Sequence, residues 1–256
     1  MAAKKINSLL LDIEGTVCPI SYVKDVLFPY AKNAAAEKIP PLTQYFPLPD
    51  NVKDLDLGAS TGTVVSSDDT ELLGYLCAFP QAARQSPVSL LGHIDGLIDN
   101  DVKDPALKAL QGYLWHSGYV SGEVTAPVYP DAVKAIKKYS KELPSGVSIY
   151  SSGSVKAQIL LFKHTTDDGD LTPYLSDYFD TINAGPKTVK ESYETISNLL
   201  GVQNDTILFL SDNPKEVEAA VAAGFNSYIV VRPGNAPLPE DAKTKYKVIT
   251  TLDDII

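Results

Sequence analysis

The second half of the chain alternates short apolar runs with stretches of helical periodicity. Short apolar runs bounded by polar or glycine residues are typical of buried parallel strands, and apolar residues three and four apart are typical of amphipathic helices. The predicted strands lie within 147–154, 178–187, 206–213 and 227–234, and the predicted helices lie at 129–143, before 163, at 188–200 and before 223. This order predicts a parallel, doubly wound sheet.

One further apolar run, LLL at 9–11, leads directly into the stretch DIEGT at 12–16. The run predicts another buried strand of the same sheet. Side chains alternate along a strand, so the carboxylates of Asp12 and Glu14, two residues apart, can point to the same side. Gly15 allows a sharp exit from the strand. The octet alone is also compatible with a surface turn that is acidic by chance.

Between the first predicted strand and the others, residues 20 to 120 show only helical signals. The predicted helices are 21–39 with a kink or break at Pro29, 68–85, 89–98, and 105 to about 117 with Asp104 as its cap. Pro, Gly, Ser and Asp dominate 40–67, which we expect to be mostly loop. The chain is therefore predicted to be an α/β protein. Residues 1–20 and 121–256 form its Rossmann-like core, and 21–120 form a helical insertion after the first strand.

Composition excludes several classes of protein. The 256 residues carry a net charge of -10, which argues against nucleic acid or an anionic membrane as the main partner. The two cysteines make no disulfide framework, and no signal peptide or transmembrane run is evident, so we expect a soluble, cytoplasmic protein; nuclear presence stays open. The three histidines lie far apart, which predicts no zinc site. No heptad pattern demands a dimer, so we expect a monomer.

Polar side chains follow the predicted strands where ligands bind in open α/β sheets. They are Asp12 and Glu14, Ser151 and Ser152, Lys187, and Asp212. This set fits phosphoryl transfer onto an aspartate, which needs a nucleophile, a divalent cation and donors for the phosphate oxygens.

Each of these residues also has a purely structural interpretation. Ser151-Ser152-Gly153 suits a helix N-cap, and Asp212-Asn213-Pro214 suits a turn and cap. Lys187 competes with Lys190, and most lysines are solvated. Cys18 has no obvious activating base, which favours a small apolar filler. We expect His116 to lie on the surface of the helical insertion.

DIEGT at 12–16, Ser151-Ser152-Gly153, Lys187 and Ser211-Asp212-Asn213 resemble the four motifs of the haloacid dehalogenase-like superfamily, in order. The resemblance is closer to the enolase-phosphatases of methionine salvage, through PISYVKDVLFPYA at 19–31, LWHSGYVSGEV at 114–124 and KESY at 190–193. It implies that the insertion is a cap, and that one Mg²⁺ per chain supports conversion of a small phosphorylated diketone, 2,3-diketo-5-methylthiopentyl 1-phosphate. The implied products are acireductone and phosphate.

The resemblance also implies roles for the residues. Asp12 would be the phosphorylated nucleophile and a Mg²⁺ ligand. Glu14 would be the general acid/base and would join the metal shell through its backbone carbonyl or side chain. Asp212 would be the third ligand, with Glu216 one helical turn on supporting it.

The phosphate-binding roles follow in the same way. Ser151 and Ser152 would hold phosphate by hydroxyl and backbone N–H, and Lys187 would pair with phosphate and with the aspartate. Three stretches depart from the family pattern: Val17-Cys18, the long proline-rich 40–67, and the acidic loop 165–172. These departures concern substrate contacts of the cap more than the chemistry of the core.

Other functions stay open at this point. Another capped phosphatase or phosphomutase of the superfamily would share the same core residues. A dehalogenase fits less well, because Glu14 and Asp212 suit a metal that halide displacement does not need. A non-catalytic scaffold is the alternative from a different class, and the presence of Asp12 argues against it.

Overall fold

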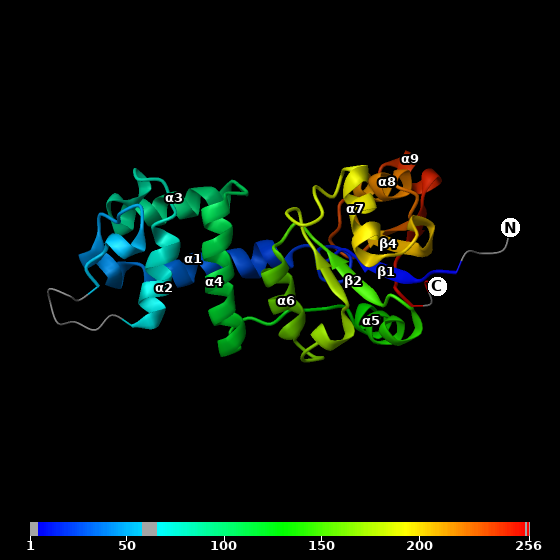
Figure 1. The fold of residues 1–256 in the computed structure, drawn as a ribbon, viewed down its shortest axis with the longest axis horizontal. Coiled ribbons are helices and arrows are strands. Elements are labelled where there is room, and N and C mark those ends of the chain that lie inside the picture. Colours follow the sequence, from blue (N-terminus) through cyan, green and yellow to red (C-terminus); the bar gives the residue numbers. More distant parts are fainter. Residues whose placement is uncertain (1–4, 58–65, 254, 256) are drawn as a thin grey trace. The chain divides into compact units, whose positions relative to one another are not determined.

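The computed structural model describes residues 5–57, 66–253 and 255. The chain divides into two compact units (Figure 1). Residues 1–24 and 124–256 form the unit that contains the sheet, and residues 25–123 form the helical unit. The part of the predicted loop 40–67 that spans 58–65 lies outside the described residues.

In the described part of the chain, six parallel strands build the sheet in the order β3-β2-β1-β4-β5-β6, so β1 occupies the interior. The strands are β1 Ser8–Leu11, β2 Val147–Tyr150, β3 Asp177–Phe179, β4 Ile207–Ser211, β5 Asn226–Val230 and β6 Lys247–Ile249. All residues of β1, β2 and β4 are buried, as their continuous apolar runs predict. The predicted α/β class and parallel sheet are confirmed.

Helices cover the two faces of this sheet, with α7 and α8 on one side and α5 on the other (Figure 1). The helices of this unit are α5 Pro130–Glu142, α6 Val155–Lys163, α7 Lys190–Leu200, α8 Pro214–Ala222 and α9 Glu240–Lys245. On the α7–α8 side, Leu10 and Phe209 from the strands pack with Tyr193 and Ala220 from the helices. Alternate strand residues thus face opposite helix layers, and the central strands β1, β2 and β4 are buried on both faces.

The helical unit contains only helices among its described elements, as predicted. They are the π-helix η1 Val23–Leu27, α1 Phe28–Lys38, the 3₁₀ turns η2 Pro40–Tyr45, η3 Val52–Asp54 and η4 Ala83–Gln85, and the helices α2 Ser67–Leu76, α3 Pro87–Asp99 and α4 Pro105–Ser121. Pro29 lies in the first turn of α1, so the predicted break is confirmed there. Leu73, Leu76, Leu90 and Leu110 are fully buried in its apolar core.

Two features of the fold differ from the prediction. The helix expected over 68–85 ends at Leu76, because Pro80 cannot donate the next backbone hydrogen bonds and disfavours helix in the residue before it. Helix α9 and strand β6 were not predicted, since each is too short and too charged to show a periodic pattern. In the described part of the chain, no helix is long and apolar enough to cross a membrane.

Candidate active site

A pocket of about 360 Å³ opens at the carboxyl ends of β1, β2 and β4. All six residues predicted from the strand ends line it, namely Asp12, Glu14, Ser151, Ser152, Lys187 and Asp212. The sheet places Asp12 there, since its backbone N–H extends the ladder by donating to the Leu210 carbonyl at 3.0 Å. The remaining lining comes from Ile20, 213–214, Glu216 and 236–239.

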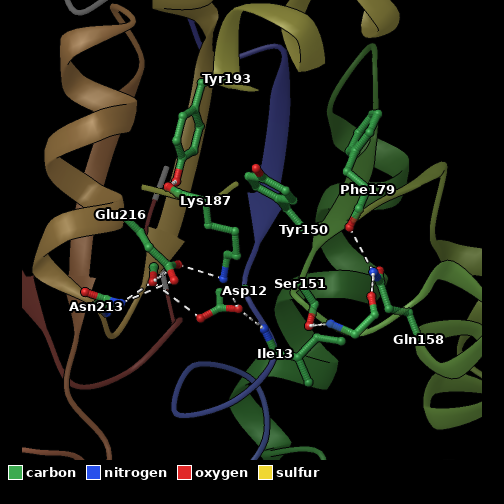
Figure 2. A network of polar contacts seen from close by, with 12 residues as sticks. Asp12, Ile13, Tyr150, Ser151, Gln158, Phe179, Lys187, Tyr193, Asn213 and Glu216 are labelled. Carbon is green, nitrogen blue, oxygen red and sulfur yellow. Dashed lines mark hydrogen bonds and ion pairs between the residues drawn. The ribbon is translucent and has the colours of Figure 1, made fainter. Parts of the chain in front are cut away.

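Lys187, one of the lining residues, lies between two carboxylates (Figure 2). Its ammonium is 2.5 Å from Asp12 Oδ1 and 2.7 Å from Glu216 Oε2, and all three residues are buried. Asp12 Oδ1 also accepts from the Ile13 N–H at 2.8 Å. The Ser211 hydroxyl is 2.8 Å from Glu216 Oε2 and 3.3 Å from Asp12 Oδ2, so its one hydrogen serves the nearer Glu216.

The charges of this cluster do not balance. Burial raises the pKa of Asp12 to about 7 against the opposing charge of Lys187, and Glu216 adds to the rise. Burial and Glu216 likewise raise the pKa of Asp212 to about 6. Burial alone would lower the pKa of Lys187, but Asp12 and Glu216 outweigh it and raise that pKa. The ammonium therefore stays charged, and the carboxylates outnumber it, so the pocket favours a further cation or a proton.

Three hydroxyl groups hold the backbone segment that carries Lys187. Tyr150 donates to the Gly185 carbonyl at 2.7 Å, Ser192 to the Pro186 carbonyl at 2.8 Å, and Tyr193 to the Lys187 carbonyl at 2.6 Å. Tyr150 and Tyr193 are fully buried, and Figure 2 shows both rings beside the lysine. The ammonium is thus presented by a fixed backbone.

Lys190, the competing lysine, lies outside this cluster. It is 48% exposed and pairs with Glu194 on the surface of α7. Lys187, by contrast, is 8% exposed. The structure therefore brings Lys187 to the carboxylates.

The serines after β2 are not the cap of the next helix. Ser154 caps α6 by accepting from the Ala157 N–H, whereas Ser151 Oγ accepts from the Gly153 N–H at 3.2 Å. The Ser151 N–H donates to the Phe179 carbonyl, so the hydroxyl is the donor that Ser151 has left for a ligand in the pocket that it lines. The capping interpretation is wrong for Ser151 and Ser152.

The turn and cap predicted after β4 belong to the residues that follow Asp212. Asn213 caps α8 by accepting from the Lys215 N–H, and Pro214 occupies the first turn. Asp212 itself lines the pocket beside Gly15, which has φ +70°. A Cβ at Gly15 would lie 2.7 Å from Asp212 Cγ, so only glycine leaves room for this carboxylate.

Glu216 has different partners from those expected. We predicted that it supports Asp212; its contacts are instead with Lys187, Ser211 and, at 3.3 Å, the Asn213 side-chain amide. The physical reason is charge, because a carboxylate gains from an ammonium and is repelled by another carboxylate. Burial is the larger cause of the raised pKa of Asp212, and the charge of Glu216 adds to it.

The residues fit a magnesium ion. Among the described residues no three Asp, Glu, His or Cys side chains group closely enough to hold a metal by side chains alone. Mg²⁺ does not need such a cage, since it commonly binds one or two carboxylates and completes its octahedron with water, carbonyl and phosphate oxygens. Asp12 and Asp212 supply two carboxylates in a pocket with surplus negative charge. This donor set suits a hard divalent cation.

Sequence reasoning missed Arg232 and Asn235, which contact the turn after Asp12. Asn235 donates to the Gly15 carbonyl and Arg232 to the Thr16 carbonyl, both at 2.9 Å. A signal was available, because both residues follow a predicted strand just as Asp212 does.

Two other residues match their predicted structural roles. Cys18 is buried, and burial together with Glu14 raises the pKa of its thiol. His116 is exposed on α4.

A scan against protein-family models finds no match. Similar curated proteins do exist: enolase-phosphatase E1 of Candida tropicalis is 44% identical over 255 residues, covering 98% of each chain. The same enzyme of Yarrowia lipolytica is 47% identical over 251 residues, covering 96% of this chain and 98% of its own. The crystal structure of the UTR4 protein of Saccharomyces cerevisiae superposes with a TM-score of 0.76 at 38% identity, over 97% and 99% of the two chains.

The parallel sheet, with a polar pocket at the end of its interior strand, has the fold of haloacid dehalogenase-like proteins. More distant structures share the fold, such as a dehalogenase with a TM-score of 0.52 at 18% identity. The chain belongs to the enolase-phosphatase E1 family, and it is therefore a phosphatase.

Proposed function

We propose that this protein converts 2,3-diketo-5-methylthiopentyl 1-phosphate to acireductone and phosphate, as an acireductone synthase of methionine salvage. The observation that carries the proposal is the buried Asp12 carboxylate held by Lys187 at the end of β1, in a pocket shared with Glu14 and Asp212. The close similarity to enolase-phosphatases supports the substrate class. On this proposal, residues 1–24 and 124–256 are the catalytic core and 25–123 the cap.

Each residue has a role in this chemistry. Glu14 takes the proton from carbon during enolisation, and solvent protonates the enolate oxygen, so Glu14 keeps its proton for the next step. Asp12 then attacks phosphorus in line, forming an acyl phosphate as the bond from phosphorus to the substrate oxygen breaks, and Glu14 supplies the proton of the leaving oxygen. Glu14 next takes a proton from the water that hydrolyses the acyl phosphate.

Ser151, Ser152 and Lys187 bind the phosphate oxygens throughout. Lys187 also stabilises the ionised Asp12 before attack, because their 2.5 Å contact favours the charged form of the carboxylate. Asp12, Asp212 and the Glu14 carbonyl would hold Mg²⁺, which supplies charge neutralisation for the phosphate when bound. The Glu14 carbonyl is preferred to its side chain, since the side chain is then available for proton transfer.

The test follows the enol chromophore and phosphate release together on the diketo phosphate, with Mg²⁺ or with a chelator. Wild type should form the chromophore and release phosphate only with Mg²⁺, and Asp12→Asn should release none. Release from other phosphate esters without a chromophore would move the assignment to another capped phosphatase or phosphomutase. No turnover of any ester would leave the scaffold alternative.

A conservative variant tests the role of Glu14. Glutamate has one methylene more than aspartate, so its carboxyl extends further from the backbone. This reach suits proton transfer at carbon as well as at oxygen. Glu14→Asp should slow chromophore formation more than hydrolysis of a simple ester. Equal rates to wild type in both assays would contradict this role.

We also infer that the protein is a cytoplasmic monomer that binds neither nucleic acid nor membrane. The net charge of -10 supports the absence of nucleic-acid and membrane partners, since anionic polymers and surfaces would repel the protein. Light scattering after size exclusion tests the monomer, and a dimer mass would contradict it.

A further inference from the structure

The turn that follows Asp12 is tight and carries Glu14 into the pocket. The Ile13 carbonyl accepts the N–H groups of Thr16, Val17 and Cys18 at 3.2, 3.0 and 2.9 Å, and the Gly15 N–H donates to the Cys18 carbonyl at 2.8 Å. These local bonds shape the turn. Its orientation relative to the sheet depends in addition on contacts from outside the turn.

Arg232 provides one of these contacts. It is 7% exposed, and its Nε donates to the Thr16 carbonyl at 2.9 Å. Its two terminal nitrogens hold the Asp131 carboxylate at 2.8 and 3.1 Å, and its charge lies 4.4 Å from the centre of the Tyr129 ring. Asp131 also accepts from the Leu252 N–H at 2.8 Å. Asp131 and Tyr129 therefore fix the orientation of the guanidinium that donates to the Thr16 carbonyl.

Asn235 provides the second contact, three residues further along the same segment. Its amide nitrogen donates to the Gly15 carbonyl at 2.9 Å. Its Oδ1 is buried with no hydrogen-bond partner among the described residues, and it would lie 2.9 Å from a Cβ placed on Gly15. Asp212 occupies the same space beside Gly15, so Asn235 reaches the immediate surroundings of the pocket carboxylates.

We propose that Arg232 and Asn235 are positioning residues for the turn that carries Glu14, and that they act by holding the carbonyls of Thr16 and Gly15. Two consecutive carbonyls are each held by a side chain from one short segment after β5, and the residues that follow it, 236–239, line the same pocket. Displacing the turn would move Glu14 relative to Asp12, whose backbone is anchored in the sheet. This inference rests on the proposed function of Glu14.

Asn235→Ala tests the proposal, with Asn204→Ala as the matched control. Asn204 also donates its amide to a carbonyl, that of Ala223 at 2.6 Å, and it does not line the pocket. We expect Asn235→Ala to lower kcat by about 10- to 100-fold with KM within twofold, because small displacements of catalytic groups cost rates of that size. The Mg²⁺ concentration that half-saturates the shift in thermal unfolding should rise about fivefold, since the turn also presents the Glu14 carbonyl. Asn204→Ala should change neither.

Arg232→Lys is the second variant, chosen because it keeps the charge and loses the planar fork. A lysine cannot hold Asp131 with two nitrogens and the Thr16 carbonyl together, so kcat should again fall with KM nearly constant. If both variants keep kcat and the Mg²⁺ midpoint within twofold of wild type while their melting temperatures fall, the residues are only structural and the proposal is wrong.

Failure of the proposed function can be told apart from failure of this inference. If wild type hydrolyses p-nitrophenyl phosphate but not the diketo phosphate, the substrate assignment fails, and the same kcat comparison is made on the simple ester. If wild type hydrolyses neither ester, the Mg²⁺ midpoints of the two asparagine variants decide: a rise confined to Asn235→Ala supports the inference, and equal midpoints overturn it.

Discussion

The two units of this protein differ in how many charged side chains they bury. Among the described residues, the sheet unit buries the charged side chains Asp12, Asp180, Lys187, Glu216 and Arg232, whereas the helical unit buries only Arg84. Arg84 holds the carbonyls of Leu48 and Pro49 and pairs with Asp50, which fastens one loop of the helical unit. In the sheet unit, three of the five belong to one cluster at the pocket.

This difference separates a unit whose buried residues mainly stabilise the fold from a unit whose buried charges form the candidate active site. A buried ion pair gains little over apolar packing, because desolvation offsets the attraction. The helical unit is accordingly built from buried leucines, and the sheet unit keeps unbalanced carboxylates where phosphate chemistry requires them. We therefore expect substitutions at the pocket to change activity and stability together, and substitutions in the helical core to change stability first.

Removing the pocket ammonium should have the largest effect. Lys187→Met leaves Asp12 and Glu216 without their shared partner, so the free energy of unfolding should fall by about 4 kcal/mol at pH 7.5. Phosphate release should fall more than a hundredfold with it. Denaturant unfolding and a phosphate assay measure the two effects. Lys190→Met is the control, and because solvent screens its exposed pair with Glu194, the free energy of unfolding should stay close to that of wild type. If both variants lost equal stability and equal activity, the buried ammonium of Lys187 would have no special role, and the prediction would be wrong.

Truncating the helical core should cost stability alone. Leu110 is fully buried, so Leu110→Ala should lower the free energy of unfolding by about 3 kcal/mol through lost burial and a residual cavity. Because no charged group changes, the Mg²⁺ midpoint of the folded protein should stay within twofold of wild type. Denaturant unfolding and Mg²⁺ titration of the melting temperature provide the measurements. A shifted Mg²⁺ midpoint would mean that packing in the helical core also affects Mg²⁺ binding, which would contradict the prediction.

The pair of Asp131 with Arg232 tests buried charge outside the pocket. Although burial opposes it, hydrogen bonds from Arg232 and Leu252 lower the pKa of Asp131 below its usual value. The ionised carboxylate therefore stabilises the fold above pH about 4, and this contribution is lost as the pH falls through the lowered pKa. Asp131→Asn should cost about 2 kcal/mol at pH 7, with a difference from wild type that shrinks below pH 4. Urea unfolding of both proteins between pH 3 and pH 7 measures this difference. A difference that stays constant over the range would contradict the prediction.

The smallest effect is expected for the hydroxyl that supports Lys187. Tyr193→Phe loses the bond to the Lys187 carbonyl, which should cost about 1 kcal/mol and lower kcat about fivefold. Ser227→Ala loses a similar buried bond, to the Phe209 carbonyl at 3.0 Å, and should cost as much stability without a change in kcat. The two variants differ only in whether the bond holds a pocket residue. A fall in kcat for both would refute that reasoning.

The amino-acid sequence by itself determined the parallel sheet except for β6, most of the helices and the six predicted residues of the pocket. Short apolar runs that alternate with helical stretches favour buried strands, and parallel strands bring their carboxyl ends to one edge. Local sequence also explains why α2 ends before Pro80, because proline has no backbone N–H to continue the helix.

The partners of the charged side chains were decided only by the tertiary structure. Lys187 meets Asp12 across 175 residues of sequence, and Arg232 meets Thr16 across 216. No local pattern encodes which ammonium reaches which carboxylate, because the choice depends on burial and on the charges that surround the site in three dimensions. Glu216 thus pairs with Lys187 and not with Asp212, four residues before it in the sequence. Asn235 reaches the turn after Asp12 from the loop that follows β5, although β4 separates β5 from β1 in the sheet.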